Sequence, residues 1–229
     1  MIKRLILTSA ALTLSASALA AQSLTDGLYI QGFAGYSQFQ DSDFSGTISG
    51  SNQSVDTDFD GGFGLGVAIG TEIPQWSNDT IGTRIELELS FRDGDVDGVN
   101  FTGNGPAAEG NISGDVTQTS LFANVLVDFK QAGALTPYVG LGIGATYSDL
   151  DFAYGPGVEL DDSDTTFAAQ IIAGVAYDLN DNTALTLDTR YTRAFDVSSD
   201  RLSPSGALTG TVEDDIDAFS VNVGLRYGF

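Results

Sequence analysis

The segment Ile81–Arg92, IGTRIELELSFR, decides the fold because its residues alternate strictly in character along the chain. The odd-numbered positions are apolar except for one threonine, whereas the even-numbered positions carry charged, polar or small residues. Side chains of a β-strand point alternately to the two faces of a sheet. This segment therefore predicts a strand with one apolar face and one polar face.

Two other segments, Phe59–Ile73 and Phe219–Phe229, repeat the alternation, and in the first of them the small face is mostly glycine. Weaker alternation completes a set of eight predicted strands, with the remaining five at 28–39, 116–129, 137–148, 167–179 and 184–195. For the strand 28–39 the sequence does not decide whether the odd-numbered or the even-numbered side chains form the apolar face, which we call the parity of the strand. Aromatic and aliphatic residues occupy both of its faces.

The connections between these strands alternate in length. The long ones are 40–58, 93–115, 149–166 and 196–216, and the short ones are 74–80, 130–136 and 180–183. The long connections are rich in Gly and Ser and hold 20 of the 31 acidic residues but a single base, Arg201. We expect them to be hydrated loops without a core of their own.

The composition excludes several classes of function. Lys and Arg number 9 against 31 Asp and Glu, a net charge of −22 that would repel the phosphate backbone of a nucleic acid. The sequence has no His and no Cys, which removes Ser–His and Cys–His nucleophiles, His/Cys zinc sites and disulfides. Only oxygen ligands, that is carboxylates and hydroxyls, remain for any chemistry.

Residues 1–20 have the pattern of a cleaved secretory signal peptide. Lys3 and Arg4 precede the apolar stretch Leu5–Leu19, and Ala18-Leu19-Ala20 is a small-x-small cleavage site. Several Thr and Ser residues interrupt this stretch, which argues against an N-terminal membrane anchor. We therefore expect an exported mature chain that starts at residue 21.

Two all-β folds fit eight antiparallel strands with one apolar face. The apolar face points inward in a soluble sandwich or lipocalin-like barrel, and outward to lipid in an outer-membrane barrel. The membrane barrel is favoured by the Gly-rich second face, the aromatic residues at strand ends, the alternating loop lengths and the final apolar strand. We predict an eight-stranded antiparallel transmembrane β-barrel over 21–229, with short periplasmic turns and four long acidic external loops.

The final segment Val221–Phe229, VNVGLRYGF, resembles the closing strand of bacterial outer-membrane proteins. Ala123–Phe129 and Pro137–Gly144 also resemble strands of the small eight-stranded barrels of the OmpA/OmpX and opacity-protein type. The resemblance implies a monomer integral to the outer membrane of a Gram-negative bacterium, surrounded by lipid and lipopolysaccharide. It further implies that the barrel-assembly machinery reads Tyr227 and Phe229 as an assembly signal.

Seven charged residues share the inward parity of the predicted strands: Arg84, Glu86, Glu88, Arg92, Asp188, Arg190 and Arg226. Four positive and three negative charges nearly balance, which predicts a network of ion pairs that fills the lumen. The alternative is a general acid–base pair formed by Glu86 and Glu88. That pair would need substrate access, which a small barrel filled by its own side chains does not provide.

One acidic segment, Asp93-Gly94-Asp95-Val96-Asp97-Gly98, matches the opening of a calcium-binding loop. The full pattern requires Glu at the twelfth position, where this chain has Asn104. Asp93, Asp95 and Asp97 are therefore candidate ligands for a divalent cation, and an acidic turn without a metal is the alternative.

These features predict a non-enzymatic outer-membrane barrel, without a cofactor, that has a structural or surface-interaction role. A narrow porin for small solutes is the first alternative, which requires unpaired charges along the lumen. An adhesin that binds an extracellular protein through 93–115 and 149–166 is the second.

The resemblance at the C-terminus generates a first prediction. Deletion of Phe229 should lower the amount of protein in the outer membrane and leave periplasmic aggregates, because assembly loses its recognition signal. Fractionation of cells expressing the deletion variant measures this. Normal surface levels of the variant would contradict it.

Overall fold

The computed structural model describes residues 27–40, 42–48, 51–59, 61–102, 112–130, 133–154, 158–202 and 208–229. Only the backbone is described for 42–48, 51–59, 95–102, 112–115, 150–154, 158–164, 196–202 and 208–214. The expected signal peptide, residues 1–20, lies outside the described residues.

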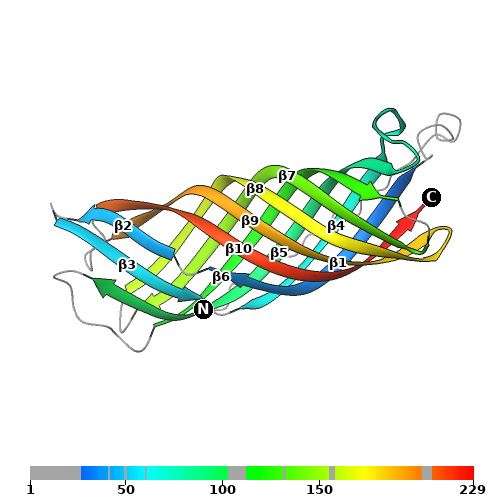
Figure 1. Ribbon diagram of the computed structural model, residues 1–229. Coiled ribbons are helices and arrows are strands. Elements are labelled where there is room, and N and C mark those ends of the chain that lie inside the picture. Colours follow the sequence, from blue (N-terminus) through cyan, green and yellow to red (C-terminus); the bar gives the residue numbers. More distant parts are fainter. Residues whose placement is uncertain are drawn as a thin grey trace, which may run out of the picture.

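Ten strand segments make up nearly all of the described chain (Figure 1). They are β1 (Leu28–Phe39), β2 (Ser42–Ile48), β3 (Ser51–Phe59), β4 (Gly62–Glu72), β5 (Ile81–Thr102), β6 (Ile112–Phe129), β7 (Leu135–Tyr154), β8 (Val158–Asn180), β9 (Thr183–Leu202) and β10 (Leu208–Gly228). A short 3₁₀ helix, η1 (Pro74–Trp76), lies in the turn after β4. Among the described residues no helix has the length and hydrophobicity needed to cross a bilayer.

Antiparallel pairing closes the sheet into a barrel. In chain order each long strand pairs with the next, and β1 pairs with β4 on one side and with β10 on the other. The wall is therefore built from β1, β4, β5, β6, β7, β8, β9 and β10, which confirms the predicted eight-stranded antiparallel barrel. Toward the extracellular end, the hairpin of β2 and β3 takes the place of β1 and β4 between β10 and β5.

The register fixes the tilt of the strands. Each residue of a strand lies opposite one residue of the next strand, so such partners can be traced once around the wall. Starting from Arg92 of β5, the trace passes through Gly64, Gly35, Asn222, Asp188, Gly174, Tyr138 and Asp128 and returns to β5 at Gly82. Arg92 and Gly82 both lie on β5, ten residues apart, so the barrel has a shear of ten. Strands of such a barrel tilt by roughly 35–45° from its axis, and eight of them leave only enough space for side chains.

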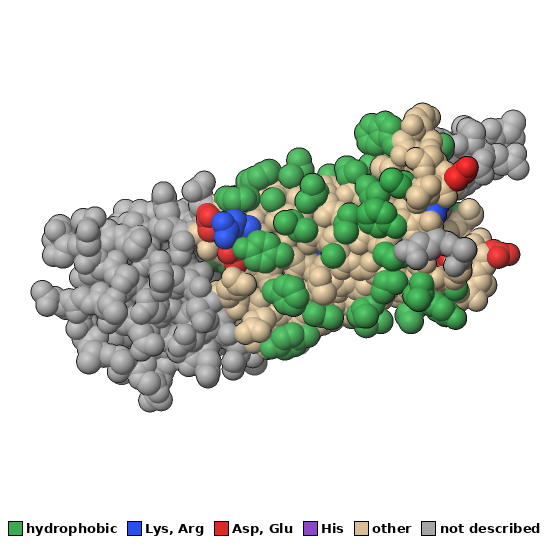
Figure 2. Space-filling view, in the orientation of Figure 1, with side chains coloured by type: hydrophobic (Ala, Val, Ile, Leu, Met, Phe, Trp, Pro, Cys, Tyr) green, Lys and Arg blue, Asp and Glu red, His purple; other side chains and the backbone are tan. Residues whose placement is uncertain are grey.

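Apolar side chains face outward and form a belt (Figure 2). On β4, for example, Leu65, Val67 and Ile69 are half-exposed, while Ala68 between them is buried. The structure also resolves the parity of β1. Tyr29 and Phe33 point into the barrel, because the residues facing them on β4 are glycines with no side chain to fill the space.

The strands extend further than the sequence pattern indicated. β5 continues to Thr102 instead of ending at Arg92, β9 reaches Leu202, and the segment 40–58 contains β2 and all of β3 except its last residue, Phe59. An acidic and Gly-rich composition indicates contact with water, and this led to the prediction of loops. A strand that extends beyond the membrane is also in contact with water, so the composition does not distinguish the two. The wall of the barrel therefore projects outward past the apolar belt.

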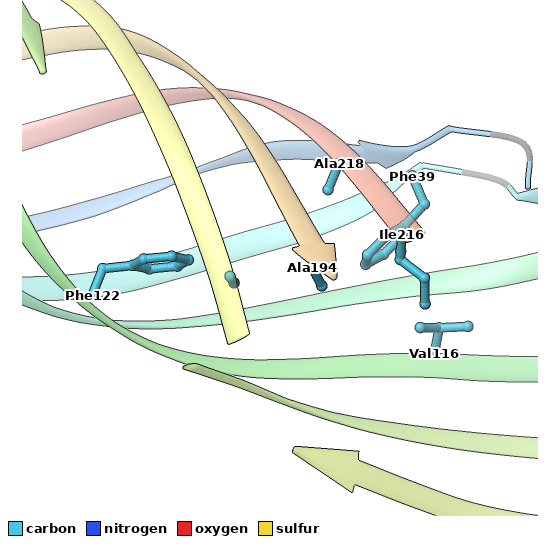
Figure 3. Close-up of a cluster of buried hydrophobic side chains, with 7 residues drawn as sticks. Phe39, Val116, Phe122, Ala194, Ile216 and Ala218 are labelled. Atoms are coloured by element: carbon cyan, nitrogen blue, oxygen red, sulfur yellow. The ribbon is translucent and has the colours of Figure 1, made fainter. Parts of the chain in front are cut away.

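Apolar side chains also lie inside the barrel, where the sequence suggested mainly polar ones. One buried cluster, drawn in Figure 3, joins Phe39, Val116, Phe122, Ala168, Ala194, Ile216 and Ala218. A second cluster joins Leu126, Tyr138, Ile172, Ala176 and Ala184 nearer the periplasmic turns. The pattern of alternation missed both, because each contributing strand supplies only one to three of these residues amid polar neighbours.

The inside–outside assignment generates a second prediction. Leu87 lies near the middle of the membrane-facing part of β5, and Leu135 lies at the periplasmic end of β7, with 52% and 54% exposure. Leu87→Arg should reduce the free energy of unfolding by about 2–4 kcal/mol, because the cation lies at the bilayer midplane. Leu135→Arg should cost only about 0–1 kcal/mol near the interface.

Urea titrations of both variants in lipid vesicles measure these losses. Equal losses at the two positions would mean that β5 does not face lipid as described.

Candidate functional site

The inner face of β5 carries a column of polar side chains along the lumen. From the periplasmic end it presents Arg84, Glu86, Glu88, Ser90 and Arg92, all between 0 and 6% exposed. The alternation of the strand places every second side chain inside, and the tilt brings residues of other strands to the same depth. The column therefore meets polar groups from across the barrel at successive levels.

Arg84 is the centre of the cluster nearest the periplasm. It forms ion pairs with Glu86 and, through Nε, with Asp128 at 3.0 Å. The Tyr29 hydroxyl donates to Glu86 Oε1 at 2.6 Å and accepts from Arg84 Nη1 at 2.9 Å. The guanidinium also lies 4.9 Å from the ring centre of Tyr138. Two carboxylates, a phenol and an aromatic ring thus surround this one cation.

Arg190 on β9 is the centre of the next cluster. Its Nη1 lies 2.6 Å from Glu88 Oε1, and its Nε donates to Asp188 Oδ1 at 2.8 Å. The Tyr138 hydroxyl donates to Asp188 Oδ2 at 2.9 Å. Asn124 Nδ2 donates to Glu88 Oε2 at 2.8 Å. Asp188 therefore accepts hydrogen bonds on both of its oxygens, whereas Glu88 accepts on Oε2 and meets Arg190 at Oε1 as an ion pair without hydrogen-bond geometry.

Three further side chains enclose this cluster. Gln170 Nε2 donates to Asn124 Oδ1 at 2.8 Å, and Asn222 Nδ2 donates to Asp188 Oδ1 at 3.2 Å. The Arg190 guanidinium lies 3.9 Å from the ring centre of Phe33. Burial of charge without such partners costs several kcal/mol, so these contacts are required for the cluster to exist.

Arg92 and Arg226 lie apart from both clusters. Arg92 bonds to hydroxyls, with Nη2 at 3.2 Å from Thr192 Oγ1 and Nη1 at 3.5 Å from Ser120 Oγ. Arg226 is half-buried at the periplasmic mouth, 5.6 Å from the ring centre of Tyr29. Neither has an ion pair among the described residues. Of the seven residues proposed from the sequence, five form ion pairs and these two do not.

Sequence reasoning missed several members of the network. Asp128 and Asn124 share the inward parity of their predicted strand, so parity alone would have found them. Tyr29 was missed because the sequence did not decide which face of its strand points inward. With Asp128 included, four arginines face four carboxylates in the interior.

The candidate cation site is only partly described. Asp93 lies in β5, paired with Thr117 of β6, and the side chains of Asp95 and Asp97 lie outside the described residues. Within the described side chains no three acidic residues come close enough to hold a metal ion. The segment continues strand β5, where the sequence suggested the start of a loop.

Comparisons with known proteins agree with this architecture. A family model, the outer membrane protein beta-barrel domain, matches residues 6–229. The outer membrane protein PagN of Salmonella typhimurium is 27% identical over 225 residues, which cover 92% of this chain and 93% of PagN.

Two solved structures share the fold at low sequence identity. Neisserial surface protein A has a TM-score of 0.53 at 18% identity, with 89% of this chain and 97% of that chain covered. The outer membrane protease OmpT from Escherichia coli has a TM-score of 0.58 at 8% identity, with 90% and 97% covered. At such identities the likeness concerns the fold alone.

The central cluster generates a third prediction. Arg190→Ala removes the guanidinium between Glu88 and Asp188 and leaves both carboxylates buried. This should reduce the free energy of unfolding by about 3–5 kcal/mol, measured by urea titration in detergent micelles.

Arg193→Ala is the matched control on the same strand. Arg193 pairs with Asp217 at 2.6 Å on the outer wall, where its side chain is 42% exposed, so its loss should be clearly smaller. Equal losses for the two variants would contradict a dominant interior network.

Proposed function

Because this chain belongs to the outer membrane protein beta-barrel domain family and is integral to the outer membrane, we propose that it is a closed, non-enzymatic barrel with a structural and surface-interaction role. The observation that carries this proposal is an ion pair that crosses the lumen. Glu88 lies on β5 and Arg190 on β9, and four steps separate these strands in either direction around the eight-stranded wall. A contact of 2.6 Å between opposite walls spans the lumen at that level, which supports a closed barrel.

A second contact crosses the lumen one level further out. Arg92 on β5 donates to Thr192 on β9 at 3.2 Å. Beyond it lies the apolar cluster that includes Phe39, Val116 and Ile216, each no more than 2% exposed (Figure 3). Ions are therefore opposed by paired charges and then by an apolar layer, both of which disfavour a hydrated path.

The same packing argues against interior catalysis. Glu86 and Glu88 are 6% and 0% exposed, and their oxygens are held by Arg84, Arg190 and Asn124. A general acid or base must reach a substrate within hydrogen-bonding distance, and these carboxylates are enclosed by the barrel's own side chains. The narrow porin is disfavoured because the two lumen cations without an ion pair among the described residues, Arg92 and Arg226, are separated by the Glu88–Arg190 contact and do not form a continuous charged path.

A surface-interaction role is supported by the wall beyond the apolar belt. Strands β5 to β10 continue past the belt, and the outer segments of the chain hold most of its acidic residues. Such a surface attracts an extracellular protein with a basic face, through complementary charge. Assembly by the barrel-assembly machinery, with Tyr227 and Phe229 as its signal, belongs to this proposal.

Conductance gives the fourth prediction. Pure refolded protein in a planar bilayer should show little or no steady conductance, because the lumen is closed at two successive levels. Glu88→Ala combined with Arg190→Ala removes only the inner of these levels and leaves the Arg92–Thr192 contact and the apolar cluster, so this variant should also show no steady conductance. A stable, ohmic and cation-selective conductance from the unmodified protein would overturn the closed barrel in favour of the porin.

A further inference from the structure

Arg92 is a buried cation to which the interior network supplies no carboxylate. It is 4% exposed and forms no ion pair with any described residue. Its two contacts are long hydrogen bonds, 3.2 Å to Thr192 Oγ1 and 3.5 Å to Ser120 Oγ. Charge-assisted hydrogen bonds usually measure about 2.7–2.9 Å, and a guanidinium has more N–H donors than these two contacts use. Much of the hydrogen-bonding capacity of Arg92 is therefore unused.

The acid that precedes Arg92 on the inner face of β5 is already engaged. Glu88 lies 2.6 Å from Arg190 and accepts from Asn124 at 2.8 Å. The balance of four arginines and four carboxylates thus holds for the interior as a whole, but not at the level of Arg92. Burial of a charge without a partner is strongly unfavourable, so this cation needs a counterpart.

A small unfilled space lies beside Arg92, against its pairing partner Gly64 on β4. A Cβ atom added to Gly64 would meet no described atom closer than 3.6 Å, with Arg92 Cγ at 3.7 Å and Ser37 Cβ at 3.9 Å. At Gly66, the next inward position of the same strand, an added Cβ would collide with the ring of Phe33. A neighbouring side chain therefore fills the space at Gly66, whereas the space at Gly64 stays open.

Two buried hydroxyls near Arg92 also lack partners. Ser37 and Ser90 are 0 and 3% exposed, and neither Oγ has a hydrogen-bond partner among the described residues. Ser37 borders the space at Gly64, and Ser90 lies two residues before Arg92 on the same inner face. Buried polar groups are nearly always hydrogen-bonded, so hydroxyls without a partner indicate a bound guest. One cation and two hydroxyl donors thus share this part of the lumen.

We propose that a chloride ion occupies the space beside Gly64 and is held by Arg92, Ser37 and Ser90. A guanidinium only donates hydrogen bonds, so the guest must accept them, and its positive charge favours an anion over a metal cation. The space suits a single atom better than a sulfate, phosphate or carboxylate group. A water molecule would accept the same hydrogen bonds but would leave the charge of Arg92 uncompensated. This site is additional to the structural and surface-interaction role and does not depend on it.

The test measures stability as a function of chloride concentration. Refolded protein in micelles is titrated with urea in mixtures of sodium chloride and sodium gluconate at constant ionic strength, which keeps general screening unchanged. Gluconate is too large for the space. Above the dissociation constant, each tenfold increase in chloride should raise the folding equilibrium constant about tenfold, because only the folded state binds the ion. Water as the guest predicts no dependence on chloride, and that result would overturn the proposal.

Arg92→Met removes the charged donor and should abolish the dependence on chloride. Arg226→Met is the matched control, because Arg226 also points inward without an ion pair among the described residues but lies half-buried at the periplasmic mouth. The control should keep the full dependence. A dependence that survives in Arg92→Met, or an equal loss in both variants, would contradict a specific site at Arg92.

Gly64→Ala tests the geometry without changing any charge. The added methyl group meets ordinary contact distances, so this variant should fold in gluconate as the unmodified protein does, but it reaches into the space for the ion. Its dependence on chloride should fall sharply, and unchanged chloride binding would count against the assigned position. Ser37→Ala should weaken chloride binding about tenfold, through the loss of one hydrogen bond to a charged group.

Crystals of the unmodified protein grown in bromide locate the ion directly and keep the test decisive if a variant does not refold. Bromide replaces chloride and scatters anomalously, so one anomalous peak should lie in the lumen beside Arg92 and Ser37. A map without an anomalous peak in the lumen would overturn the proposal.

Discussion

The hydrogen-bonded ring of strands is the constraint on which every other feature of this protein depends. A lipid bilayer offers no partner to a backbone N–H or C=O group, so a sheet within it must pair all of its edges. Pairing of β1 with β10 meets that requirement. Closure in turn assigns one side of each strand to lipid and the other to a narrow interior, and the alternation of apolar and polar residues follows from it.

The narrow interior then decides which residues fit beside the charged clusters. A Cβ atom added to Gly142 would lie 2.8 Å from Gln170 Cγ, and one added to Gly174 would lie 2.6 Å from the Tyr138 ring and 2.7 Å from Asp188 Cβ. These glycines leave the space that the amide and phenol groups of the network occupy. The Gly-rich face of the strands is therefore the counterpart of the large polar side chains opposite.

Parity predicted which face of a strand each charge would occupy, but it carries no information about depth or about the strand opposite. It placed Glu88 and Arg190 inside, and their contact depends on the shear of ten, which no single segment reveals. For the same reason Arg226 was grouped with residues that lie deeper in the lumen. The first strand was ambiguous because Tyr29 and Phe33 face glycines and turn inward, whereas Tyr36 of the same strand turns outward.

The ion pair between opposite walls also has a consequence for the order of folding. In a sheet that has not yet closed, β5 and β9 are four strands apart, about 19 Å at the usual spacing between strands. Glu88 and Arg190 cannot meet in such an intermediate, and each keeps its hydration. Glu88 and Arg190 lose their hydration and form their ion pair only when the two edge strands of the sheet pair. Dehydration of the interior and closure of the wall therefore form a single cooperative step.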